Sequence, residues 1–246
     1  MVVLVLVVVL VGVAWWLSDA KLRKKHDITF HAGPVPQATE IALAQGKHLL
    51  ETRGCVDCHG KDMGGKTVMN NPAMGRIDAP NVTHGPGGLP AAYSDADWER
   101  AIRHGLRADG SGLYLMPCSD YAAMSEPDMG ALITYLKTLP PVDHAAAPIQ
   151  LGPVARVLLA TGTIHLAADV IDHEHLQPAV VAPVATVEYG QYLAMTCAGC
   201  HGANFSGGKF AAGPPDWPPA ANLTPAAGLG TFPIALRGSS FTTSRR

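Results

Sequence analysis

Two short segments of the chain share the pattern C-x-x-C-H, in which a histidine directly follows the second cysteine. One contains Cys55, Cys58 and His59, and the other contains Cys197, Cys200 and His201. This pattern is typical of c-type haem attachment, in which each thiol adds to a vinyl group of the porphyrin and the histidine binds the iron. A C-x-x-C pair alone also suits a zinc site or a redox dithiol. The adjoining histidines and the repetition favour haem, so we predict two covalent haem c groups.

The composition limits the classes of function. The chain has 246 residues, 48% of them hydrophobic, and a formal net charge of −2. This length suits one large domain or two small ones, and the charge offers no basic surface for nucleic acid. Four of the five cysteines lie in the two motifs, which argues against a disulfide framework. The fifth, Cys118, is expected to be a small buried apolar side chain, and a free thiol near the haem edge is the alternative.

The first 17 residues are apolar throughout and predict a transmembrane anchor, which we assign to residues 1–20. A helix of that apolar length spans ~25 Å, close to the thickness of a bilayer core. Trp15 and Trp16 lie where aromatic residues anchor a span at the interface. A cleaved signal peptide is the alternative, because Ser18 and Ala20 are small. The length of the apolar run favours the anchor.

The elements that must position the first motif follow in order. Residues 21–38 are predicted to form a tether, and residues 39–53 a helix that leads into Cys55. Residues 60–90 are rich in Gly, Pro and Asn and are expected to form a loop around the haem. Two further helices are predicted at 93–106, with a capping box, and at 125–139. Residues 142–185 read as a proline-rich linker with one helical stretch, expected to pack over or between the haem domains.

Residues 186–246 repeat the pattern of residues 39–141, which suggests duplication of one domain. The corresponding positions outside the motifs are Gly46 and Gly190, 81–83 and 222–224, and 101–103 and 235–237.

Residues 39–141 resemble a class I cytochrome c domain: a helix, C-x-x-C-H, a loop, Met-Pro and a C-terminal helix. The segments APNVT, YSDADWERAIRHG, ALITYLKTLPPV and EYGQYLA…CAGCHG…SGGK…NLTP resemble membrane-anchored multi-haem cytochrome c subunits of periplasmic dehydrogenases. The resemblance implies an all-α fold of tandem class I cytochrome c domains behind an N-terminal transmembrane helix. It also implies that Gly46 lies where the first helix crosses the last, against Tyr135 or Leu136.

The resemblance also points to Met116 as the distal ligand of the first iron, opposite His59. A His/Met pair keeps iron low-spin and raises its potential by stabilising Fe(II). Three rival methionines lie close behind the proximal histidine, where reaching the opposite face of the ring is harder: Met63, Met69 and Met74. Met124 and Met129 are expected to be ordinary packing residues.

The second site departs from this pattern. Met195 is the last methionine and precedes Cys197, so no sulfur ligand follows His201. The tail at 239–246 has no helical pattern, and we expect a second domain cut short by a truncated or frameshifted reading frame. The alternative is a real site with an open sixth position. A substitute ligand is conceivable from His165, His173 or His175, although the segment 172–175, which resembles a metal cluster, reads better as a solvated linker.

These features predict a dihaem electron carrier rather than an enzyme on its own. By resemblance, its donor is a periplasmic dehydrogenase, its acceptor is a respiratory-chain component, and its place is the periplasmic side of the inner membrane. Lys21, Arg23, Lys24 and Lys25 follow the span and oppose this orientation under the positive-inside rule, but the haem motifs outweigh them. A haem enzyme, such as a peroxidase acting at the second haem, is the alternative function.

Overall fold

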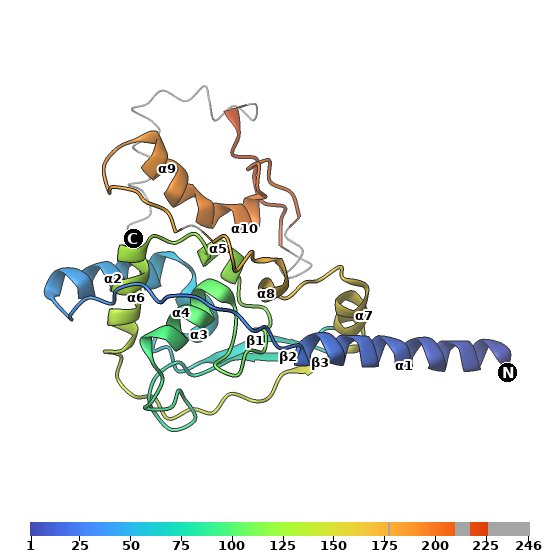
Figure 1. Ribbon diagram of the computed structural model, residues 1–246. Coiled ribbons are helices and arrows are strands. Elements are labelled where there is room, and N and C mark those ends of the chain that lie inside the picture. Colours follow the sequence, from blue (N-terminus) through green and yellow to red (C-terminus); the bar gives the residue numbers. More distant parts are fainter. Residues whose placement is uncertain (177, 210–216, 226–246) are drawn as a thin grey trace. The chain divides into compact units, whose positions relative to one another are not determined.

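The computed structural model describes residues 1–176, 178–209 and 217–225 (Figure 1). The chain divides into two compact units, residues 1–180 and residues 181–246. The first C-x-x-C-H motif lies in the first unit and the second motif in the second unit. Each unit is therefore described by itself.

The core of the first unit is built from three helices that lie where the sequence predicts them. They are α2 (Glu40–Thr52), α4 (Asp95–His104) and α6 (Glu126–Leu136). The Thr39 and Ser94 hydroxyls accept hydrogen bonds from the first turns of α2 and α4, and Ser94 and Asp97 form the predicted capping box. These caps satisfy amide groups that a helix leaves free at its start.

Helices α2 and α6 cross closely at Gly46, as the resemblance implies. A Cβ atom at Gly46 would lie 2.2 Å from the Ala131 carbonyl oxygen and 2.6 Å from the Cβ of Tyr135. The two backbones can approach this closely only because glycine has no side chain. Around the crossing lies one buried apolar cluster, formed by Leu49, Leu50, Met63, Trp98, Ile102, Tyr121, Met124, Met129, Leu132, Ile133 and Leu136. We call it the main core.

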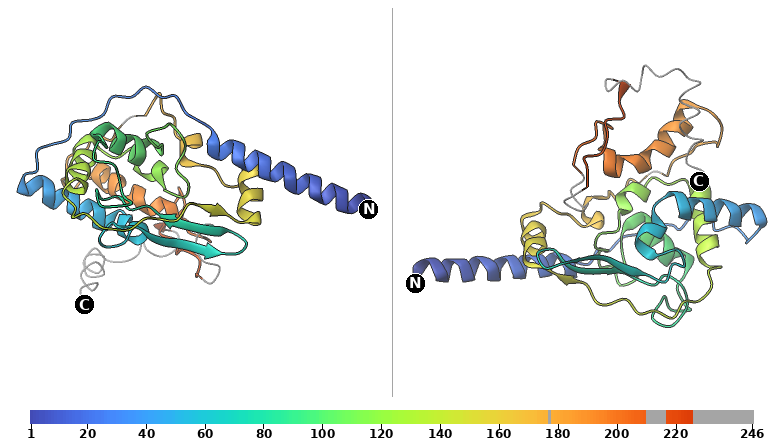
Figure 2. Two further views of the ribbon diagram at one scale, coloured as in Figure 1. Left: turned by 90° about the horizontal axis from the view of Figure 1, so that it is seen from below. Right: turned by 180° about the vertical axis from the view of Figure 1, so that it is seen from behind.

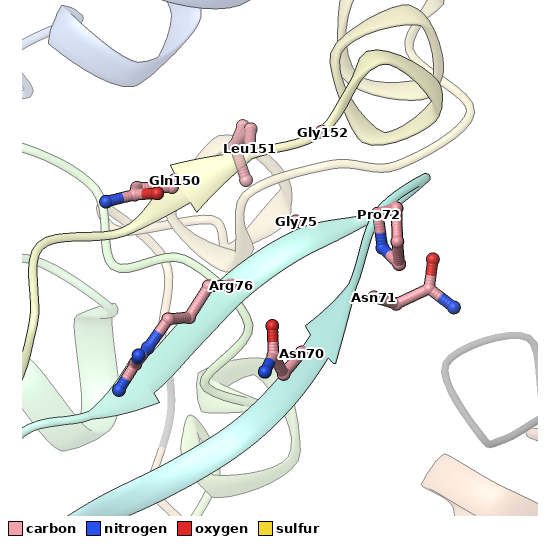
Figure 3. A pocket seen from close by; sticks show the side chains of 8 residues that line it. All are labelled: Asn70, Asn71, Pro72, Gly75, Arg76, Gln150, Leu151 and Gly152. Atoms are coloured by element: carbon pink, nitrogen blue, oxygen red, sulfur yellow. The ribbon is translucent and has the colours of Figure 1, made fainter.

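The prediction of an all-α fold is wrong, because the segment expected to be a loop contains a β-hairpin. Strand β1 (Lys66–Asn71) pairs antiparallel with β2 (Gly75–Ala79), and β3 (Gln150–Leu151) pairs antiparallel with β2. The hairpin shows little apolar alternation because β1 has no buried residue, while only the end of β2, from Ile77 to Ala79, is buried. Figure 3 shows the shallow pocket at the hairpin tip, with Pro72 across from Leu151 and Gly152.

Helix α1 (Val2–Arg23) is one continuous helix that extends beyond the apolar run. Among the described residues it is the one helix long and apolar enough to cross a membrane, with a mean hydropathy of 2.5 over its most apolar window. Only 6% of that window is buried against the rest of the protein. Length and composition thus allow a membrane span, and a signal sequence would pass the same test.

The segment predicted as a tether packs along the first unit. The His26 amide donates to the Gly110 carbonyl at 2.9 Å, and the Gly33 amide donates to Glu99 Oε2 at 2.7 Å. Farther on, the Thr134 hydroxyl donates to the Pro36 carbonyl at 2.9 Å. These bonds join the end of α1 to the helices that surround the first motif.

The helical stretch of the predicted linker forms α7 (Pro153–Thr161), which is followed by α8 (Ala167–Val170). Helix α5 (Cys118–Tyr121) is the short helix between α4 and α6. Helix α7 packs against α1 (Figures 1 and 2). Its buried residues form a second apolar cluster with Leu151 and Leu166. Elsewhere in the same predicted linker, β3 pairs with β2 and α8 packs against α5, so parts of this segment cover the first unit.

The second unit contains α9 (Val187–Ala194), a 3-10 turn (Met195–Cys197) and α10 (Ala198–His201). The Thr186 hydroxyl accepts from the Tyr189 amide, as Thr39 does at the start of α2. The predicted counterpart of 101–103 at 235–237 and the tail at 239–246 lie outside the described residues.

Candidate haem-attachment sites

The first motif occupies the short helix α3 (Cys55–His59), which follows α2 after a left-handed residue, Gly54 at φ 79°. Residues three apart on a helix lie on neighbouring turns of one face, so the two thiols lie on one side of α3. Both cysteines are free and half-buried. Burial raises the pKa of Cys55 to about 11 and also raises that of Cys58, so both thiols are protonated at neutral pH.

The His59 side chain is already held in the form that an iron ligand needs. Its Nδ1 lies 2.9 Å from the Pro80 carbonyl oxygen. A carbonyl oxygen can only accept, so Nδ1 carries the proton and Nε2 keeps its lone pair. Burial lowers the pKa of His59, against the opposing effect of the Pro80 bond, and favours the neutral ring. Metal-binding histidines commonly have their second nitrogen fixed in this way.

The second motif repeats this arrangement. His201 Nδ1 lies 2.7 Å from the Ala221 carbonyl oxygen, and the His201 carbonyl accepts from the Gly207 amide at 2.8 Å. The corresponding bond in the first unit joins the His59 carbonyl to the Gly65 amide, also at 2.8 Å. Both histidines therefore keep Nε2 as the free ring nitrogen.

The loops behind the two histidines agree as well. Met63 has φ 59° and Phe205 has φ 58°, a left-handed conformation that non-glycine residues rarely adopt. The Met63 carbonyl accepts from the Val82 amide at 3.0 Å, and the Phe205 carbonyl accepts from the Leu223 amide at 2.8 Å. Such agreement in unusual backbone geometry supports duplication of one haem-binding unit.

The next residues complete the match. Asn81 Oδ1 accepts from both the amide and the hydroxyl of Thr83, and Asn222 Oδ1 accepts from both groups of Thr224. The acceptor carbonyls of Pro80 and Ala221 immediately precede these asparagines. Sequence reasoning paired the asparagines but missed the carbonyls, although their position just before the repeated Asn-x-Thr was the available signal.

The two units differ in what surrounds the motif. Cys55 and Cys58 are half-buried, whereas Cys197 and Cys200 are exposed among the described residues. A Cβ atom at Gly190, the counterpart of Gly46, would meet no described atom within 4 Å. The described part of the second unit therefore contains the attachment motif and its loop, but no helix crossing at Gly190.

The main core offers a surface for the first haem. Cys55 and Met116 are both partly buried and both pack against this cluster. Trp98 is 4% exposed, and its Nε1 has no hydrogen-bond partner in the described protein. A buried indole N–H usually has an acceptor, and a haem propionate is one such group. The two thiols on one side of α3, the oriented His59 and the unsatisfied Trp98 donor thus fit a covalently attached haem.

The remaining methionines occupy different places. Met63 is 2% exposed and belongs to the main core, as do Met124 and Met129. Met74 instead packs against the second cluster near α7, and Met69 lies on strand β1. Of the three methionines considered as alternatives to Met116 for the distal position, Met63 is therefore the one that lies in the same core. The assignment of Met116 as the distal ligand stays a prediction.

A buried Arg103 guanidinium braces the turn between α5 and α6, which sequence reasoning did not foresee. Its Nε donates to Glu99 Oε1 at 2.6 Å, and its Nη1 donates to the carbonyls of Ala122 and Met124 at 2.9 and 2.7 Å. Arg103 is one of the repeated positions, and its counterpart Arg237 lies outside the described residues.

Cys118 is buried, as predicted, with its Sγ 3.3 Å from the Ala101 carbonyl oxygen. Burial raises its pKa to about 12. The thiol is therefore protonated and shielded from reaction.

The segment 172–175 does not form a metal cluster. His173 turns toward His104, with the two Nδ1 atoms 3.0 Å apart, and its Nε2 lies 3.0 Å from the Ala168 carbonyl. His175 instead contacts Asp172. Among the described residues, no three His, Cys, Asp or Glu side chains gather as a metal site.

The buried His104 predicts acid sensitivity. Burial, then the neighbouring His173, Arg103 and Arg100, lower its pKa to about 4. Because this folded value lies below the unfolded one, the neutral ring stabilises the fold fully above about pH 6.5 and progressively less below it. Between pH 7.5 and 5.0 we expect His104 to account for a loss of about 2 kcal/mol in the free energy of unfolding, measured by urea titration.

His175→Gln is the matched control for this prediction, because His175 is exposed and should leave the loss unchanged. His104→Gln should make the free energy of unfolding less dependent on pH. An unchanged dependence in His104→Gln would contradict the prediction.

An oriented His59 behind two helix-borne thiols, next to an apolar core, defines a c-type haem-binding domain. The cytochrome c family model matches residues 43–140. The first unit therefore contains a cytochrome c domain, and membership of this domain in the family implies covalently bound haem c.

The chain is also similar to larger cytochrome proteins. It is 32% identical over 127 residues to the gluconate 2-dehydrogenase cytochrome c subunit of Pantoea cypripedii, covering 50% of this chain and 27% of that protein. It is 31% identical over 160 residues to the fructose dehydrogenase cytochrome subunit of Gluconobacter japonicus, covering 58% and 32%. A diheme cytochrome c-type protein of Cereibacter sphaeroides is 27% identical over 160 residues, covering 61% and 51%. The chain thus spans less than a third of the two dehydrogenase subunits.

Proposed function

We propose that this chain is a dihaem c-type cytochrome that passes electrons from a periplasmic dehydrogenase to a respiratory-chain component. The matching histidine geometry in the two units carries the proposal. His59 and His201 each have Nδ1 fixed by a carbonyl, so each presents Nε2 to an iron. When bound, haem c supplies a one-electron Fe(III)/Fe(II) couple.

The residues have distinct roles in this proposal. Cys55 and Cys58 would hold the first haem, Cys197 and Cys200 would hold the second, and His59 and Met116 would supply the protein ligands of the first iron. The carbonyl bonds fix the orientation of both imidazole rings, which would limit the structural change between the two redox states of a bound haem. The apolar main core excludes water from one side of the first site and so helps set its potential.

The relatives support the choice of donor. Two of them are named as cytochrome subunits of gluconate and fructose dehydrogenases. We propose a dehydrogenase of this kind as the electron donor, with the chain held by α1 at the periplasmic face of the inner membrane. The apolar length of α1 supports this anchoring.

Haem counting tests the proposal. The wild-type chain, matured where c-type haem is attached, should carry two covalent haems, measured by pyridine haemochrome absorbance per chain and by haem-stained gels. Replacing Cys55 and Cys58 with serine should leave one haem, and so should replacing Cys197 and Cys200. Each pair removes both thioether bonds of one site and leaves the other untouched.

Cys118→Ser is the matched control, since Cys118 lies outside both motifs and should leave two haems. A single haem in the wild type, unaffected by loss of Cys197 and Cys200, would contradict the dihaem proposal. Peroxide turnover that disappears with those two cysteines would instead support a haem enzyme.

A further inference from the structure

Side-chain hydrogen bonds join helix α7 to the last turns of α1. Arg156 Nη1 donates to Ser18 Oγ at 2.9 Å and to Asp19 Oδ1 at 2.7 Å, and the guanidinium lies 4.6 Å from the centre of the Trp15 ring. Lys21 Nζ donates to the Leu159 carbonyl at 2.7 Å, near the end of α7. These contacts fix the position of α7 relative to the end of α1.

The buried face of α7 packs into the second apolar cluster. Ala155 and Leu159 are 0% exposed and form the second apolar cluster with Leu151 and Leu166. Leu22 of α1 packs against the same cluster. The orientation of α7 about its own axis is therefore set by both apolar packing and the Arg156 contacts.

The opposite face of α7 is exposed and uncharged. Val154 is 45% exposed and Val157 is 48% exposed, and they lie three positions apart, on one side of the helix. The one charged residue of the helix, Arg156, is turned toward α1. A helix that faces water ordinarily carries charged residues on its exposed side, as α2 does with Glu40, Lys47 and Glu51.

The hairpin tip extends this uncharged surface. The Val154 amide donates to the Ala73 carbonyl at 2.9 Å, which places the exposed tip 71–73 beside the start of α7. Figure 3 shows Asn71 and Pro72 at this tip, near Gly152, where the chain enters α7. The tip carries no charged side chain at these three positions.

Exposed tryptophans of α1 lie beside α7. Trp15 is 40% exposed and Trp16 is 67% exposed, at the level of α1 where α7 docks. Tryptophans of this kind gather at membrane interfaces. At the end of α1, Arg23 is exposed and lies 3.4 Å from Asp19, and a basic side chain there can also meet anionic headgroups.

We propose that α7 is a membrane-surface helix whose Val154–Val157 face lies among the lipid headgroups, so that the first haem domain rests on the bilayer in a fixed orientation. The inference rests on the proposed anchoring by α1. The occupant of the exposed face is a lipid surface, because α7 packs against α1, whose apolar side chains are exposed along most of the helix. An amphipathic helix can lie in the interface plane with its apolar face toward the lipid.

A nitroxide label tests this arrangement in the haem-loaded full chain, reconstituted in vesicles of phosphatidylcholine and phosphatidylglycerol. Single variants V157C, V9C and I41C are labelled, and the accessibility of each label to oxygen and to a water-soluble nickel chelate is compared. All three sites are exposed, with Val9 in α1 and Ile41 in α2. The buried Cys118 should take no label, which the unsubstituted chain checks.

We expect the oxygen-to-nickel accessibility ratio to be highest at position 9, lowest at 41 and intermediate at 157. A ratio at 157 equal to that at 41, with a high ratio at 9, would overturn the membrane-surface role of α7 and leave the anchor standing. A ratio at 9 equal to that at 41 would overturn the anchor and the α7 proposal together. The haem count is independent of both results.

Discussion

Replacing Met116 with leucine is expected to lower the reduction potential of the first haem by roughly 0.1–0.3 V, within the ~0.8 V range that axial ligands command. The thioether stabilises Fe(II), and leucine cannot replace it as a ligand. We also expect loss of the absorption band that sulfur ligation gives the ferric haem. Potentiometric titration followed by visible spectra measures both effects.

Met63→Leu is the matched control, because Met63 lies in the same main core and the swap nearly conserves volume. Such a swap usually costs less than about 1.5 kcal/mol, and the potential should change little. A large fall in Met63→Leu with none in Met116→Leu would show that Met63 is the ligand.

The structure gives a reason to expect Met116 to be well placed. The Met116 carbonyl accepts from the Cys118 amide at 2.9 Å, and Cys118 is buried against Ala101. On the other side, Leu115 takes φ 68°, an uncommon value for leucine. The surroundings therefore hold Met116 on a short, constrained segment at the edge of the main core, and strained loops of this kind are commonly found at functional sites.

The sequence predicted the helices of the first unit well, since their signals are local. Ser94 and Asp97 mark the start of α4 because they form its capping box. Gly46 lies in the middle of α2 because the backbone of α6 passes too close for a side chain there. The same locality explains why both C-x-x-C-H motifs could be recognised. Each motif spans five consecutive residues, in α3 for the first and across the 3-10 turn and α10 for the second.

Features that depend on distant partners could not be predicted in this way. The β1–β2 hairpin has little buried surface, so it carries a weak periodic signal, and β3 joins it from a segment read as linker. Similarly, the positive-inside rule treated Lys21, Lys24 and Lys25 as indicators of membrane orientation. In the structure they pair with Leu159, Asp169 and Asp109, contacts that only the folded unit brings together.

Equivalent substitutions at Gly46 and Gly190 are expected to have opposite effects on stability. Gly46→Ala places a methyl group 2.2 Å from the Ala131 carbonyl oxygen, so α2 and α6 must separate. Overpacking of a well-packed site costs about 1–3 kcal/mol, and a backbone clash of this size belongs at the upper end. Gly190→Ala meets no described atom, and should gain up to about 1 kcal/mol from the higher helix propensity of alanine.

Urea unfolding of the two variants, followed by the absorbance of each haem and by far-ultraviolet circular dichroism, measures the difference. Each variant is the control for the other, because both glycines lie in the helix before a C-x-x-C-H motif. An unchanged midpoint in Gly46→Ala would contradict the close crossing of α2 and α6. Equal losses at both positions would mean that the Gly190 face of α9 is also covered by a helix, which would make the second unit a more complete counterpart of the first than its described residues indicate.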